Sequence, residues 1–150
     1  MTMLKMYLED VRWNSESELS VLVFSNLECS ETMELYVPSA VGFDLWVTLD
    51  VKREDGDMPY FGIMDIISQI DGEFIMLFVG KNQAPETIMA KLEITGVQFE
   101  VEMTVKDAVT IAILQDLPIY FDKSLRNKDK LSLSQKLFRK KISEITRYSF

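Results

Sequence analysis

The sequence predicts a domain of the α+β class, with a mostly antiparallel sheet, packed helices and a basic C-terminal helical extension. Three observations predict it: apolar residues alternate strictly in 88–94 and 97–103, they recur at helical spacing in 63–70, and the charge changes sign near residue 126. The chain has 150 residues, of which 47% are hydrophobic and 27% charged. This balance is that of a globular domain, which at this length buries roughly two thirds of its unfolded surface.

The first third of the chain predicts three strands and a helix. Residues 3–13 alternate loosely and predict a strand, and 19–24 and 33–37 predict two more, paired across the polar loop 25–32. Ser39 is the expected N-cap of a helix over 40–50. Its apolar residues recur at helical spacing, and we expect them in the core: Val41, Leu45, Trp46 and Leu49.

A charged loop over 52–59 is expected before a second helix. Ile63, Ile66, Ile67 and Ile70 form the apolar stripe of that helix, which is predicted to end near Gly72. Asp65 is expected on its exposed face. The acidic residues at 54–57 offer carboxylate oxygens for a hard cation, but their spacing is also that of a solvated turn.

The clearest pattern is a group of three antiparallel strands. Residues 74–79 are a continuous apolar run, and the alternating segments 88–94 and 97–103 are separated only by Thr95 and Gly96. That pair is suited to a tight hairpin turn. The alternation predicts a sheet with one solvated face.

Residues 104–121 predict a strand-to-helix-to-strand unit. Thr104 and Asp107 have the spacing of a capping box, and 105–114 have almost no polar face, which predicts a buried helix. Pro118 ends that helix because proline cannot continue the hydrogen-bond ladder. Residues 119–121 then predict a short buried strand.

The C-terminal segment differs in charge from the rest. Residues 1–122 carry 7 Lys and Arg against 22 Asp and Glu, a net charge of −15, whereas 123–150 carry 9 against 2, a net charge of +7. A helix over 132–147 with an apolar stripe is expected, docking on the body or on a second subunit. Its cations are candidates for phosphate contacts: Lys136, Arg139, Lys140 and Arg147. They equally fit a solvated helix face.

Composition excludes several kinds of chemistry. The chain has no histidine and one cysteine, Cys29, which rules out Ser-His-Asp and Cys-His catalysis, histidine-bearing zinc sites and an internal disulfide. Glycine spacing shows neither a P-loop nor a dinucleotide fingerprint. The apolar runs are too short to span a bilayer, and the N-terminus lacks signal-peptide features, so we expect a cytoplasmic protein without a membrane partner.

The order of elements, and above all "DAVTIAILQDLPIYF" at 107–121, resembles the bifunctional nuclease family, small domains of bacteria and plants with DNase and RNase activity. The family carries an Arg-Pro-Ser-Asp-Ala segment, an apolar helix and a Pro-Ile-aromatic strand. The positions that match are Asp107, Ala108, Val109, Ala112, Pro118, Ile119 and Tyr120. Weaker similarity covers 1–125, so the resemblance divides the chain into a nuclease-like domain, 1–125, and an extension, 126–150.

This resemblance implies a nuclease that cleaves DNA or RNA, with Mg²⁺ or Mn²⁺ as the candidate cofactor, and a homo-oligomer. Asp107 is the candidate catalytic residue that the resemblance implies. The alternative interpretation is that Asp107 only caps the helix. Thr104 stands where the family has arginine, and Asp107 is the one polar position that matches.

The replaced polar positions keep a second function open, a non-catalytic binding or assembly module on the same fold. Small-ligand sensing is a third possibility, for which the sequence singles out no residue.

Overall fold

The computed structural model describes residues 3–13, 16, 18–54, 62–80 and 87–126, which form a seven-stranded sheet and three α-helices. The strands are β1 Met3–Arg12, β2 Leu19–Ser25, β3 Thr32–Pro38, β4 Gly72–Val79, β5 Thr87–Ile94, β6 Val97–Thr104 and β7 Ile119–Asp122. The helices are α1 Ser39–Arg53, α2 Gly62–Gln69 and α3 Val105–Gln115, and the 3-10 turn η1 spans Lys123–Arg126. The α+β class is confirmed.

The sheet is mixed and curled, with strand order β3-β2-β1-β7-β4-β5-β6. Neighbouring strands are antiparallel except β4 and β7, which are parallel. Strand β1 joins the two halves: residues 3–6 pair with β7 and residues 7–12 pair with β2, with a bulge between Leu8 and Asp10. A bulge bends its strand and increases the local twist, which favours the curl.

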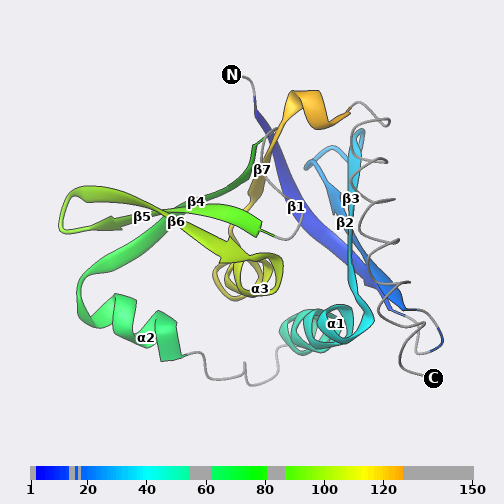
Figure 1. The fold of residues 1–150 in the computed structure, drawn as a ribbon, viewed down its shortest axis with the longest axis horizontal. Coiled ribbons are helices and arrows are strands. Elements are labelled where there is room, and N and C mark those ends of the chain that lie inside the picture. Colours follow the sequence, from blue (N-terminus) through cyan, green and yellow to red (C-terminus); the bar gives the residue numbers. More distant parts are fainter. Residues whose placement is uncertain (1–2, 14–15, 17, 55–61, 81–86, 127–150) are drawn as a thin grey trace, which may run out of the picture.

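Helices α1 and α3 lie side by side within the curve of the sheet, where both are seen nearly end-on in Figure 1. Helix α3 connects edge strand β6 to central strand β7. Six of its eleven residues are buried, as the sequence predicts: Val105, Ala108, Val109, Ile111, Ala112 and Ile113. Between the two halves of the sheet, the rings of Phe24 and Phe121 meet edge to face at 5.3 Å.

The hairpins and turns are confirmed. Strands β2 and β3 pair over their whole length, and β5 pairs with β6 from Thr87–Thr104 to Ile94–Val97. At the hairpin turn Thr95 has φ 48° and Gly96 has φ 84°, the two positive values that a type I′ turn requires.

Two expectations for α1 are wrong. Ser39 is the first helical residue, because Pro38 takes the cap position and the Ser39 N–H donates to the Glu18 carbonyl at 3.0 Å. This tertiary hydrogen bond satisfies the donor without a side-chain cap. The helix also continues through Lys52 and Arg53, so the expected loop begins later, and its residues 55–59 lie outside the described part.

The expected combination of one buried and one solvated face holds for β5, whereas on β6 the face expected to be buried is exposed as well. Strand β5 alternates between buried and half-buried residues, whereas β6 is exposed on both faces except at half-buried Met103. The helix layer covers the sheet only as far as β5. The alternation of apolar residues in the sequence cannot predict where this cover ends, because the cover depends on tertiary packing.

The Thr104 cap predicts a specific loss of stability. Its Oγ accepts the Asp107 N–H at 3.2 Å, so Thr104→Ala should lower the free energy of unfolding by about 1 kcal/mol in urea denaturation. Thr110→Ala is the control, because that hydroxyl donates to the Lys106 carbonyl within the same helix. Equal effects of the two substitutions would contradict the cap.

Gly42 predicts a second loss, for a steric reason. A Cβ at this position would lie 2.0 Å from the Cβ of Ser20, because α1 rests directly on β2 here. Helix propensity alone favours Gly42→Ala by about 1 kcal/mol. We expect a net loss of about 1–3 kcal/mol from overpacking, partly recovered by adding Ser20→Gly. A more stable Gly42→Ala protein would show that the helix can move away.

Candidate functional site

Asp107 lies in the first turn of α3 with an exposed side chain. Its N–H is bonded to Thr104, and its carboxylate interacts favourably with the positive end of the helix dipole. In the described part of the chain, no group of three or more acidic or cysteine side chains gathers at a position that could hold a metal ion. A catalytic role for Asp107 stays a prediction from the resemblance.

Most of the other candidates from the sequence lie outside the part of the chain that the structure describes. Lys136, Arg139, Lys140 and Arg147, with the whole expected helix 132–147, lie outside the described residues, as do 55–57 of the acidic loop. Asp65 is exposed on α2, as expected. Cys29 is an exposed free thiol in the turn between β2 and β3.

The structure instead connects α1 and α3 by ion pairs at both ends. Lys106 Nζ lies 2.9 Å from Asp44 Oδ2 near the start of both helices, and Lys52 Nζ lies 3.2 Å from Asp116 Oδ2 near their ends. The two helices therefore run parallel. Lys52 also donates to the Leu114 carbonyl at 3.4 Å, where a cation interacts favourably with the C-terminal end of α3.

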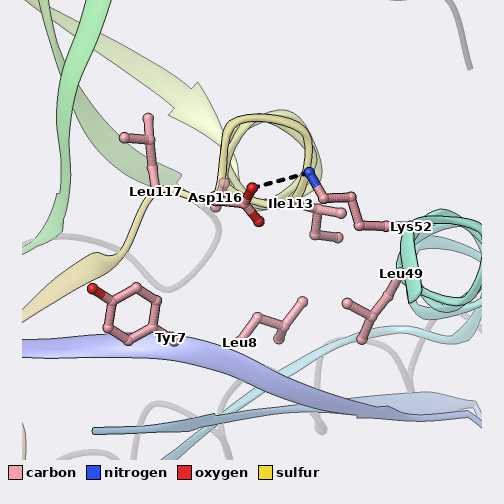
Figure 2. Close-up of a pocket in the computed structure, with 8 residues that line it drawn as sticks. Tyr7, Leu8, Leu49, Lys52, Ile113, Asp116 and Leu117 are labelled. Carbon is pink, nitrogen blue, oxygen red and sulfur yellow. Dashed lines mark hydrogen bonds and ion pairs between the residues drawn. The ribbon is translucent and has the colours of Figure 1, made fainter. Parts of the chain in front are cut away.

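A pocket of about 250 Å³ opens beneath the second of these ion pairs, between β1, α1 and α3. It is lined by Tyr7, Leu8, Leu49, Lys52, Ala112, Ile113, Asp116 and Leu117. Figure 2 shows the Lys52–Asp116 contact spanning the two helices, with Leu8 and Leu49 below it and Tyr7 near Leu117. The walls are mostly apolar, and one ammonium group stands among them.

Local backbone features shape this pocket. Arg53 donates to the carbonyl of Glu9, which lies in the β1 bulge, and this bond ties the end of α1 to the strand. Asp116 ends α3 in the left-handed conformation, φ 53°, and the Leu117 N–H returns to the Ala112 carbonyl. The end of α3 at 116–118 is predicted by the sequence. The sequence does not single out Lys52 as a site residue, because its partner Asp116 is 64 residues away.

In the sheet of the described residues, strand β6 is an edge strand, and we call this edge the β6 edge. Val97, Phe99 and Val101 project from one face and are 54%, 47% and 41% exposed. Gln98, Glu100 and Glu102 alternate with them and project from the other face.

Helix α2 lies near the turn end of this hairpin, on the apolar side. Ile67 is buried against Gly72, next to Ile94, whose cross-strand partner is Val97. The other isoleucines of the predicted stripe, Ile63, Ile66 and Ile70, are exposed. The apolar residues of the β6 edge are therefore continued by those of α2.

An aromatic cluster lies elsewhere, on α1. Trp13 is 4.7 Å from Phe43 and 5.9 Å from Trp46, measured between ring centroids. The expectation that Trp46 belongs to the core is wrong, because 39% of it is exposed and it packs on Trp13 at the surface.

The comparisons complete this description. None of the helices in the described part of the chain has the length and apolar character needed to cross a bilayer. Neither protein-family models nor curated proteins gave a match to this chain.

Proposed function

We propose that this domain is a non-catalytic binding module that takes up an extended segment of another protein along the β6 edge. The observation that carries the proposal is the exposure of Val97, Phe99 and Val101 on an eight-residue edge strand. Within the described residues no strand pairs with β6 on its outer side.

The edge has no lysine, proline or bulge, and its charged side chains, Glu100 and Glu102, oppose only a strand that is itself acidic. Natural edge strands are kept from pairing by lysine, proline, bulges or short length. Strand β6 contains neither lysine nor proline, and its register with β5 runs from Val97 to Thr104 without a bulge. Its outward backbone groups are therefore available to a further strand, the mode of recognition known as strand addition.

The charges of β6 define the chemistry of the partner. An added strand places its alternate side chains on the same two faces as β6. On one face they meet Val97, Phe99 and Val101, and on the other they meet Glu100 and Glu102. Cross-strand pairs of opposite charge stabilise a sheet, so a segment that alternates apolar and basic residues is complementary.

The same rule opposes a second copy of this chain at the same edge. When β6 pairs antiparallel with itself and keeps the apolar faces together, the register centred on Val101 places Glu100 opposite Glu102, and the register centred on Glu100 places that residue opposite its own copy. Like charges directly opposite destabilise a sheet.

Nuclease activity is the competing function. Hydrolysis assisted by a metal requires carboxylates converging on the ion, and among the described residues no group of three or more acidic or cysteine side chains could hold one. We expect the purified protein to leave single- and double-stranded DNA and RNA intact with Mg²⁺ or Mn²⁺, as followed by gel electrophoresis. Metal-dependent cleavage that is lost in Asp107→Asn would overturn the non-catalytic proposal.

Peptide binding tests the proposal directly. A fluorescent peptide of alternating valine and lysine should bind the protein in anisotropy titrations, and one of alternating valine and glutamate should bind at least roughly tenfold more weakly. The double substitution Glu100→Lys with Glu102→Lys should reverse this preference.

The control variant carries Glu28→Lys with Asp50→Lys, which makes the same change in net charge at exposed positions away from β6. It should keep the preference for the basic peptide. An equal loss in both variants would indicate attraction by overall charge alone. A wild-type dimer that Phe99→Lys dissociates in sedimentation equilibrium would identify a second copy as the occupant.

A further inference from the structure

We infer that the pocket between β1, α1 and α3 binds a small ligand that has an unbranched apolar body and a carboxylate, with Lys52 as the group that recognises the charge. The inference is independent of the β6 edge. The pocket supplies specific residues for small-ligand binding, a function for which the sequence alone singles out no residue.

The lining is that of a ligand site. Small-molecule pockets are mostly apolar, with a few placed polar groups that fix orientation. Here Leu8, Leu49 and Ile113 supply apolar walls from three different elements. Lys52 and the hydroxyl of Tyr7 are the hydrogen-bond donors among the lining side chains.

Lys52 is positioned to exchange its partner. An ammonium group has three donors, and two of those of Lys52 are directed to Asp116 Oδ2 and to the Leu114 carbonyl. The Asp116 side chain is 81% exposed, whereas that of Lys52 is 30% exposed. An ion pair with so exposed a carboxylate contributes little, so a ligand carboxylate in the less solvated pocket can replace it.

The sign of the ligand charge follows from the same geometry. Asp116 is exposed to solvent and is already paired with Lys52. A cationic ligand would therefore be repelled by Lys52 and would find no unpaired carboxylate among the lining side chains. Arg53, next in the chain, adds a second positive charge at this end of α1. Arg53 is bonded to the Glu9 carbonyl and does not line the pocket, so Lys52 is the one cation among the lining side chains.

The pocket is partly open to solvent, and its volume gives the size of a ligand that would fill it. About 250 Å³ corresponds to roughly eight water volumes, and therefore to a ligand of about eight non-hydrogen atoms. Hexanoate has this size and chemistry, and hexanamide is its uncharged counterpart of the same shape. The pair separates charge recognition from apolar filling.

The experiment is a titration of methyl-labelled full-length protein with each compound, followed by NMR. Hexanoate should shift the methyl signals of Leu8, Leu49 and Ile113 with saturation, and hexanamide should bind roughly tenfold more weakly. Lys52→Met should abolish the preference for hexanoate. Asp116→Asn should strengthen hexanoate binding several-fold, because it removes the competing carboxylate.

Lys106→Met is the matched control, since it breaks the other ion pair between α1 and α3 and lies outside the pocket. It should leave hexanoate binding unchanged. Equal binding of hexanoate and hexanamide, the absence of saturable shifts, or equal losses in Lys52→Met and Lys106→Met would each overturn the inference. If Lys52→Met does not fold, weaker binding by Asp116→Asn has the same consequence.

Discussion

The rest of the structure depends on the burial of α3 against the curled sheet. This helix carries the chain from β6 at the edge to β7 at the centre, where β7 pairs in parallel with β4 and antiparallel with β1. A parallel neighbour requires such a crossover, and an almost wholly apolar helix is suited to lie inside the curve. Apart from α3, the two halves of the sheet are joined by the pairing of β1 with β7 and by the contact of Phe24 with Phe121.

The packing of α3 also determines where α1 lies. Ala108 and Ala112 are buried and small, which permits a close neighbouring helix, and α1 rests on β2 at Gly42 with no room for a side chain. The ion pairs at the two ends join exposed or half-exposed groups and contribute little energy. These ion pairs therefore determine how α1 and α3 are aligned more than they add to the free energy of unfolding. The pocket forms where the ends of α1 and α3 meet the bulge of β1.

The two proposed sites have a common origin in this arrangement. Helix α3 starts at the end of β6 that is remote from the hairpin turn, so the helix layer covers Ala90 and Leu92 of β5 and leaves their partners Val101 and Phe99 exposed. At its other end α3 stops at Asp116, beside Lys52. One end of the helix thus leaves an open strand edge, and the other forms a small pocket with a cation in its wall.

The sequence by itself determined the local elements of this protein. Period-two alternation specified the β5–β6 hairpin, Thr95 and Gly96 specified its turn, and the Thr104 cap with Pro118 set the limits of α3, because each depends on neighbouring residues. Tertiary structure alone decided which apolar residues are covered. Trp46 and Phe99 have core-like patterns but remain exposed, since burial depends on which element lies opposite. It also decided the meeting of Lys52 with Asp116, because chain folding, not spacing, brings residues 64 positions apart into contact.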